Sequence, residues 1–358
     1  MSKDAVRGAV DRKLLLVGSV PLDNSTAVFQ ALAQHLGDRL SRVPDGETGS
    51  RRYWIHCQNR VLEGNPHFEP VEREVDVRDK RSDGTRPPPR FRIRSSLDEA
   101  KIGALGYAQW AIESYAALRK LKQDAKVPRN WKLQVGLPTP HAFVQHLIVA
   151  GQQADVESVY EARMREEVQA ILAAIPADEL AIQWDVASEF ASIEGVRPHY
   201  YAKVWDDIVE RLTRLGEMVP TGVELGYHLC YGDLGHRHFT EPTDAGNLTL
   251  LMNRVSASAR RTIDWFHIPV PRDRTDSVYY APLRDLRLHA DNELYLGLIH
   301  LTDGEEGCRR RIAAAQAVCK NFGLATECGF GRRPASTIPQ ILDLHRQLVT
   351  PEMVAERS

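Results

Sequence analysis

The residues with the clearest capacity for chemistry in this sequence are one histidine and two cysteines. His228 and Cys230 close the apolar run 222–230, and Cys328 closes a second apolar run, 322–328. Side chains two positions apart on a β-strand point to the same face, so His228 and Cys230 can reach one point. One imidazole and two thiolates suit zinc, and three protein ligands beside an open position are typical of a catalytic zinc. The spacing alone is equally compatible with a buried histidine and two unrelated core cysteines.

The composition limits the class of protein. Of the 358 residues, 43% are hydrophobic and 26% are charged, and the formal net charge is -2. This is a globular composition, and it argues against nucleic acid or a membrane surface as a partner. Because no apolar run resembles a signal peptide or approaches the length of a membrane span, we expect a cytoplasmic protein. The five cysteines are irregularly spaced, which argues against a disulfide framework.

Eight short apolar runs alternate with amphipathic helical patterns. The runs that we expect to form strands are 14–19, 39–44, 131–138, 180–186, 222–230, 262–268, 294–301 and 322–328. Alternating strands and helices are typical of parallel βαβ units, and eight such units predict a single α/β domain over residues 1–358, the (β/α)8 or TIM barrel. The main alternative is a doubly wound open sheet, but the sequence GSVPLDN after the first run lacks a glycine-rich phosphate loop.

The alternation is broken between the second and third expected strands. Residues 45–130 contain a Pro-Pro-Pro run, which forbids regular structure, and then a helical pattern from about Ser96 to Lys122. We therefore expect an insertion in the barrel over about residues 60–125. A lid over the site and a solvated surface excursion are equally compatible with this segment.

Polar side chains gather at the carboxyl ends of the expected strands, where the active site of a TIM barrel lies. They are Ser19, Glu47, Asp185, His228, Cys230, His267, His300, Asp303, Glu327 and Cys328. Zinc deprotonates a coordinated thiol, which gives a nucleophile at neutral pH and favours attack by sulfur on an alkyl carbon. Carboxylates at the same rim, those of Glu47 and Asp185, are placed to hold a substrate ammonium group.

Four polar residues near these strand ends have simpler interpretations. Asp303 and Glu327, taken singly, are typical of surface or core polar groups. His236 and His238 follow the metal motif on an expected loop, where solvated histidines are common.

Five short motifs resemble the catalytic barrel of cobalamin-independent methionine synthase and the related zinc thiol-alkyltransferases, in the superfamily that includes uroporphyrinogen decarboxylase. They are Gly18-Ser19-Val20-Pro21, Gly46-Glu47 with Arg51, Ile182-Gln183-Trp184-Asp185, Tyr227-His228-Leu229-Cys230-Tyr231 and Glu327-Cys328-Gly329-Phe330-Gly331-Arg332. They occur in the order of that family, at the ends of expected strands one, two, four, five and eight.

The resemblance implies a zinc-dependent S-methyltransferase or alkyltransferase of the methionine biosynthesis type. Its partners would be a homocysteine-like thiol as acceptor and an alkyl donor, and its cofactor Zn²⁺. The residues that it implies are the zinc ligands His228, Cys230 and Cys328, Ser19 facing the substrate carboxylate, Glu47 and Asp185 at the amino group, and Asp185 and His300 in catalysis.

The sequence also departs from the family pattern. Where the family has a glutamate as fourth zinc ligand, this chain has Pro269, so the fourth position is either open or filled by His267, two residues earlier on the same strand face. Residues 300–303 replace the motif that carries a catalytic histidine. Residues 137–141 contain no counterpart of the tryptophan that carries the folate. We therefore expect a donor other than polyglutamyl methyltetrahydrofolate.

Two other functions fit the sequence. A metal-free decarboxylase or lyase, as on the uroporphyrinogen decarboxylase barrel, needs cationic clamps for carboxylates, for which the candidates are Arg51, Arg52, Arg90, Arg92 and Arg94. A zinc-binding homologue without catalytic activity is the second alternative, because the motifs of strands six and seven are altered. The oligomeric state is left open.

Overall fold

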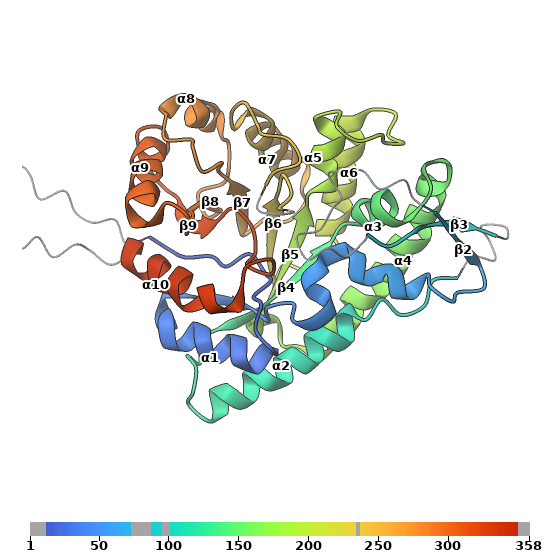
Figure 1. The fold of residues 1–358 in the computed structure, drawn as a ribbon, viewed down its shortest axis with the longest axis horizontal. Helices are drawn as coiled ribbons and strands as arrows, with labels where there is room; N and C mark the ends of the chain where they lie inside the picture. The colour runs from blue at the N-terminus through green and yellow to red at the C-terminus, as the bar shows by residue number, and fades with distance from the viewer. Residues whose placement is uncertain (1–11, 73–86, 95–100, 234–236, 350–358) are drawn as a thin grey trace, which may run out of the picture.

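A curled sheet of parallel strands forms the centre of the computed structural model, which describes residues 12–72, 87–94, 101–233 and 237–349 (Figure 1). In this part of the chain the sheet has seven strands in the order β1-β4-β5-β6-β7-β8-β9, and all neighbours are parallel. The strands are β1 (Arg42–Pro44), β4 (Lys132–Pro138), β5 (Leu180–Val186), β6 (Glu224–Leu229), β7 (Trp265–Pro269), β8 (Glu293–Ile299) and β9 (Gly323–Thr326).

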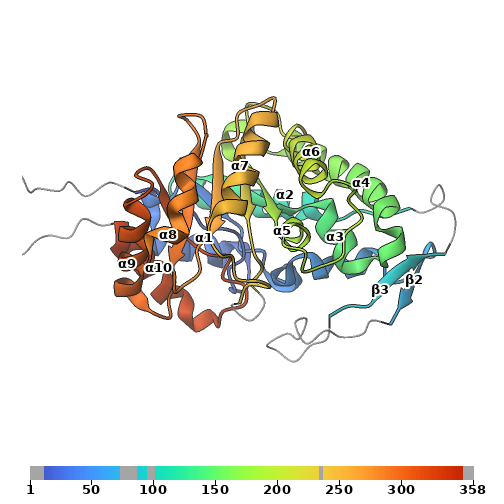
Figure 2. The ribbon, with the colours of Figure 1, turned by 90° about the horizontal axis from the view of Figure 1, so that it is seen from above.

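Helices cover the outside of this sheet, as the two views at right angles show (Figures 1 and 2). The α-helices are α1 (Ser25–His35), α2 (Tyr107–Gln123), α3 (Pro140–Leu147), α4 (Gln153–Ala174), α5 (Ser188–Ile193), α6 (Val204–Gly216), α7 (Gly246–Ser258), α8 (Ser277–Tyr280), α9 (Gly304–Gln316) and α10 (Ile338–Val349). The 3-10 helices are η1 (Gly37–Arg39), η2 (Gly49–Val61), η5 (Ala150–Gln152), η6 (Ala177–Glu179), η7 (Ala281–Asp285) and η8 (Ala335–Thr337). Helix α10 packs against α1, so the last and first helices lie side by side. None of the helices in the described ranges combines the length and apolar character that crossing a membrane requires.

Residues 14–19, the first expected strand, lie between the two edges of the sheet. Leu14 forms a parallel bridge with Leu324 of β9, and Ser19 forms one with Gly46, just beyond β1. These isolated bridges connect both edge strands to the same segment. The predicted α/β class and a TIM-barrel-like sheet are thus confirmed, whereas an eighth regular strand is not formed among the described residues.

The strands are buried on both faces, as expected of a parallel sheet that is covered by helices. All seven residues of β5 are buried. A small cluster of Leu15, Ala181, Trp265, Tyr295 and Ala325 is separate from the main core, and its members alternate along the strands with residues of that core. This alternation places the cluster on the inner face of the curled sheet.

The segment between β1 and β4 contains a hairpin and a helix of the outer layer. Strands β2 (Phe68–Val71) and β3 (Arg90–Ile93) pair antiparallel in a sheet of their own, to the right in Figure 1. The Pro-Pro-Pro run at 87–89 has no regular structure, as predicted. Helix α2 begins at Tyr107, because Gly106 has a φ of 86° in the left-handed region, which a right-handed helix cannot include. Ser96, near which the helical pattern starts in the sequence, lies outside the described residues. Since α2 packs against α1 and α4, it belongs to the helical layer of the barrel. The limits of the expected insertion, residues 60–125, stay a prediction.

Candidate metal centre and adjoining site

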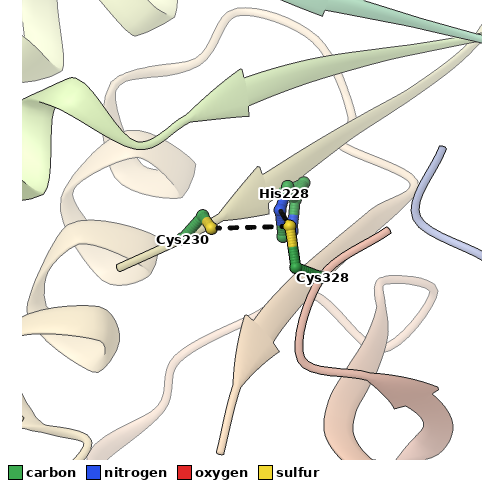
Figure 3. A group of neighbouring side chains, drawn as sticks. All are labelled: His228, Cys230 and Cys328. Carbon is green, nitrogen blue, oxygen red and sulfur yellow. Dashed lines mark hydrogen bonds between the residues drawn. The ribbon is translucent and has the colours of Figure 1, made fainter. Parts of the chain in front are cut away.

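One histidine and two cysteines meet at the carboxyl ends of β6 and β9 (Figure 3). The sulfur of Cys328 lies 3.9 Å from the sulfur of Cys230 and 3.8 Å from Nε2 of His228. The three donor atoms all lie within 4.8 Å of one another. The backbone N–H of Gly232 donates to the Cys230 sulfur at 3.2 Å, which helps to fix its direction. The predicted convergence is confirmed, and the role of these residues as zinc ligands stays a prediction.

The separations of these donor atoms match what zinc requires. A tetrahedral zinc with Zn–S bonds of about 2.3 Å and Zn–N bonds of about 2.0 Å separates two sulfurs by about 3.8 Å and a sulfur from a nitrogen by about 3.5 Å. The observed distances of 3.9 Å and 3.8 Å are within a few tenths of an ångström of these values. His228 and Cys230 are buried, while Cys328 is partly exposed, which leaves a side for a further ligand. The donor set therefore fits zinc.

His267 of β7 lies beside this triad but offers it no lone pair. Its Nδ1 is 2.7 Å from Nδ1 of His228, and its Nε2 is 2.9 Å from the carbonyl oxygen of Thr326. Because both ring nitrogens are engaged within the protein, neither is left for a metal. Of the two alternatives for the fourth position, the geometry favours the open one.

Without a metal, two members of the triad, His228 and Cys328, are uncharged at neutral pH. Burial and the neighbouring His267 lower the pKa of His228 well below its usual value, and burial lowers that of His267 to about 4. The hydrogen bond with Cys230, followed by burial, raises the pKa of the Cys328 thiol well above its usual value. Ionisation of this thiol at neutral pH therefore requires a bound cation.

A tight turn after β1 presents Glu47. Gly46 and Glu47 have positive φ values of 85° and 46°. Asp45 stabilises this turn, because its Oδ1 accepts the backbone N–H of Glu47 at 2.8 Å and its Oδ2 accepts hydrogen bonds from Arg51 at 2.8 Å and Ser114 at 2.7 Å. The strained backbone at Glu47 is thus held in place by a buried carboxylate with three partners.

Glu47 and Asp185 form a carboxylate pair, as we call it below, over the backbone of β4. A Cβ atom at Gly136 would lie 3.2 Å from Oε1 of Glu47 and 3.6 Å from Oδ2 of Asp185, so both side chains occupy the space that a side chain at this position would fill. The side-chain amide of Gln183 donates to Asp185 Oδ1 at 2.9 Å, and the indole of Trp54 also hydrogen-bonds to Asp185. The structure therefore brings together the two carboxylates that the sequence assigned to a substrate amino group.

Burial makes ionisation of the carboxylate pair unfavourable. Burial, then Asp185 and Asp45, raise the pKa of Glu47 to about 8. Burial raises the pKa of Asp185 to about 7, against the opposing hydrogen bonds from Gln183 and Trp54. Near neutral pH the pair accordingly holds one to two protons, and a cation between the carboxylates would displace them.

Ser19 contacts the loop that follows Cys328. Its hydroxyl oxygen accepts the backbone N–H of Gly331 at 3.1 Å, and its carbonyl oxygen accepts that of Phe330 at 2.6 Å. A Cβ atom at Gly329 would lie 2.4 Å from the Ser19 hydroxyl oxygen, so this approach depends on glycine. Ser19 thus positions the loop beside a candidate ligand, and its contact with a substrate carboxylate stays a prediction.

His300 points to Glu327, the residue before Cys328. Its Nδ1 lies 3.7 Å from Glu327 Oε1, and its Nε2 hydrogen-bonds to the carbonyl oxygen of Val270 at 2.9 Å. On the other side, Nε2 of His238 lies 3.6 Å from Glu327 Oε2. Glu327 therefore lies between two imidazoles, a placement that its position in the sequence did not indicate.

The side chain of His238 is only 4% exposed, and it is therefore not solvated as the sequence suggested. The neighbouring Phe239 is held beside the end of β6, since its N–H donates to the carbonyl oxygen of Tyr231 at 2.8 Å. No sequence pattern signals this contact. His236 lies outside the described residues.

Asp303 has the structural role that its sequence context favoured. It accepts two hydrogen bonds from the buried Arg311, at 2.6 and 2.8 Å. The arginines that a metal-free lyase would need lie on two separate elements and have protein partners. Arg51 of η2 pairs with Asp45. Arg92 lies in β3 and Arg94 directly follows it, and their side chains are 3.6 and 3.7 Å from that of Glu69.

The fold is shared with three solved structures. The chain superposes on a B12-independent methionine synthase from a Shewanella species, in complex with selenomethionine, with a TM-score of 0.61, 14% identity and coverage of 95% of this chain and 97% of that one. A putative vitamin-B12 independent methionine synthase from Listeria monocytogenes superposes with a TM-score of 0.52 and 13% identity, over 93% of this chain and 96% of that one. A methyltransferase from Methanosarcina mazei superposes with a TM-score of 0.53 and 11% identity, over 95% of each chain. No protein-family model and no curated protein sequence matches the chain. At these identities the likeness concerns the fold, and it confirms that the chain has the fold of the methionine synthase-like structures that its five motifs resemble.

Proposed function

We propose that this protein is a zinc-dependent S-methyltransferase or alkyltransferase that activates a thiol acceptor. The observation that carries the proposal is the convergence of His228, Cys230 and Cys328 at donor separations that fit zinc, with one position open. The structural neighbours support it, since they include proteins described as a methionine synthase and a methyltransferase. The fold itself does not select a reaction, so the argument depends on the site.

The proposed reaction transfers an alkyl group from a donor CH₃–X to a thiol RSH. Zinc bound to the triad would lower the pKa of an acceptor thiol and so supply a thiolate at neutral pH. A lone pair of the sulfur forms the new S–C bond, the C–X bond breaks, and its electron pair leaves with X. The proton of the thiol is finally found on X, so that the products are RSCH₃ and HX. We assign His300 to this proton movement, because its imidazole lies 3.7 Å from Glu327, next to Cys328.

The acceptor that we propose is a homocysteine-like amino thiol. Its ammonium group would bind to the carboxylate pair, and its carboxylate would lie near Ser19. Asp185 and His228 are register partners in β5 and β6, one residue before the last pair of this ladder. This neighbourhood supports a substrate that reaches both the metal and the carboxylates.

The donor that we propose is not a polyglutamyl folate. After β4, where the related enzymes carry a tryptophan for the folate, this chain has His141, which is only 1% exposed. Its ring nitrogens hydrogen-bond to Tyr200 and Ser192, at 3.1 Å each, so the position is filled by a polar cluster of the protein. A corrinoid protein, a small methylated metabolite or an electrophilic substrate remains as donor. We also propose that residues 14–19, through their isolated bridges to both edges of the sheet, close the barrel in the place of a regular eighth strand. We further propose that the protein acts in the cytoplasm.

Metal content tests this function. The protein is purified without added zinc, and zinc per chain is measured in the wild type, in Cys328→Ser and in the control Cys319→Ser, whose cysteine is also partly buried but lies outside the triad. We expect one zinc per chain in the wild type and the control, and none in Cys328→Ser. A folded wild type without zinc would overturn the proposal in favour of a metal-free lyase. Zinc without a lowered pKa of bound homocysteine would instead indicate a non-catalytic zinc protein.

A further inference from the structure

A chain of hydrogen bonds links the candidate ligand His228 to the backbone beside Cys328. Nδ1 of His228 lies 2.7 Å from Nδ1 of His267, and Nε2 of His267 lies 2.9 Å from the carbonyl oxygen of Thr326. His228 and His267 are register partners on β6 and β7, and Thr326 closes β9. The two imidazoles are 3% and 0% exposed, so water does not compete for these bonds.

The direction of the bonds follows from the one group that can only accept. Because the Thr326 carbonyl has no proton to give, Nε2 of His267 must donate to it. A neutral imidazole carries a single N–H, so Nδ1 of His267 accepts, and Nδ1 of His228 donates the only proton between the two rings. The reverse arrangement would require an imidazolium in this buried site, and among the described residues no carboxylate is bonded to either ring.

This proton arrangement determines which nitrogen His228 presents to the cysteines. With its proton on Nδ1, His228 keeps an unprotonated Nε2, the atom that lies 3.8 Å from the Cys328 sulfur. A histidine that binds a metal usually donates its second N–H to a fixed acceptor, which sets its tautomer and its ring orientation. Here that acceptor is a second imidazole.

We propose that His267 is a positioning residue for the metal, one that holds His228 in the tautomer and orientation that present Nε2, and is not itself a ligand. The proposal rests on the metal site of the proposed function. Thr326 lies two residues before Cys328, and its hydroxyl donates to the Cys328 carbonyl oxygen at 2.7 Å. The same short segment therefore fixes both a cysteine ligand and, through His267, the histidine ligand.

Variants at His267 distinguish the effect of its accepting nitrogen on zinc affinity from the effect of its size. In His267→Asn the side-chain oxygen takes a place close to Nδ1 and can accept from His228, whereas His267→Leu removes the acceptor. His267→Gln keeps an amide donor for the Thr326 carbonyl, but it places the amide group away from Nδ1 of His228, which therefore loses its acceptor. The loss of such a partner typically lowers metal affinity by about 10- to 100-fold. We expect this loss for the Leu and Gln variants and a change below about threefold for Asn.

Two measurements decide the matter. Competition with a chromogenic chelator gives the zinc affinity of each variant, and the visible spectrum of the Co²⁺-loaded protein reports its ligands. In addition, ¹⁵N NMR of the metal-free wild type reports the tautomer of His228 directly. We expect a proton on Nδ1 of His228, and Co²⁺ bands at unchanged energies in His267→Gln and His267→Asn, because the ligand set is the same.

Each contrary result has its own meaning. A proton on Nε2 of His228, or zinc affinities of the Gln and Leu variants equal to that of the wild type, would overturn the inference and leave the metal site standing. Co²⁺ bands that indicate a lost ligand in the Gln and Asn variants would overturn it by making His267 a ligand. A wild type that binds neither Zn²⁺ nor Co²⁺ would overturn the proposed function itself. Should the Leu variant fail to fold, the comparison of Asn with Gln decides.

Discussion

Binding of an amino acid at the carboxylate pair should release protons from the protein, by an amount that depends on pH in a defined way. The perturbation is saturation with L-methionine, whose α-amino group is largely an ammonium cation between pH 6.5 and pH 8.5. An ammonium ion between Glu47 and Asp185 favours their ionised forms, because an opposite charge within a few ångströms offsets the burial that now keeps them protonated. Binding should therefore convert both carboxyl groups to carboxylates.

The magnitude follows from the raised pKa values of the pair. With values of about 7 and about 8, the free pair holds about 1.7 protons at pH 6.5 and about 0.3 at pH 8.5. If the bound pair is fully ionised, these numbers equal the protons released on binding. The sign is fixed, since raised pKa values in the free protein mean that protons leave, and are not taken up, when the cation arrives.

Isothermal titration calorimetry provides the assay. The binding enthalpy of L-methionine is measured at each pH in two buffers with different ionisation enthalpies, and the difference gives the number of protons exchanged. Glu47→Gln is the control, and it should release fewer than one proton at pH 6.5 because only Asp185 remains. Binding without proton release at pH 6.5, or with the same release at pH 8.5, would refute the assignment of the pair to an ammonium group.

Three substitutions test the packing that the site depends on. In Gly136→Ala the new Cβ crowds the carboxylate pair at 3.2 Å, and we expect L-methionine affinity to fall by about tenfold, measured by calorimetry, with a near-normal unfolding midpoint; unchanged affinity would contradict this placement. In Gly226→Ala the Cβ would lie 1.8 Å from the Trp265 ring, so overpacking should lower the free energy of unfolding by at least about 1–3 kcal/mol in a urea titration, and a wild-type midpoint would show the contact to be wrong. In Trp54→Phe the loss of a hydrogen bond to Asp185, of about 0.5–1.5 kcal/mol, should weaken L-methionine binding at pH 6.5 by about two- to tenfold, more than at pH 8.5, where the pair is already ionised.

The meeting of the three candidate ligands was predictable from the sequence. Its physical basis is the strand period of two, which places His228 and Cys230 on one face, together with the parallel order of the strands, which brings every carboxyl end to one edge of the sheet. Neither inference depends on the register between neighbouring strands. The same reasoning predicted that Glu47 and Asp185 would share that edge.

The contacts that the sequence did not predict depend on register or on loop closure. His267 meets His228 because β6 and β7 pair these two residues directly, and a shift of two residues would have separated them. The side chain of His238 is little exposed, and a backbone hydrogen bond between Phe239 and Tyr231 holds the adjoining residue beside the end of β6. Regularity was also overestimated in residues 14–19, which make only isolated bridges at the two edges of the sheet. The pattern of apolar residues identifies such a segment, but the number of backbone hydrogen bonds that it forms depends on the strands beside it.

The two halves of the site share an electrostatic property that bears on the choice of acceptor. The hydrogen bond with Cys230 and burial keep the Cys328 thiol protonated, and burial keeps the carboxylate pair mostly protonated at pH 6.5, so binding of a cation makes each half anionic, zinc in one case and ammonium in the other. A simple alkyl thiol would engage the metal but leave the carboxylates protonated and without a partner. An amino acid without a thiol would ionise the carboxylates but leave the open metal position unused. Only an amino thiol satisfies both halves at once, and for this reason we favour a homocysteine-like acceptor over other thiols. In a screen of thiols at equal concentration, removal of the amino group should therefore weaken binding most above pH 8, where the carboxylate pair is largely ionised and needs a cation, and least below pH 7, where protons occupy most of the pair.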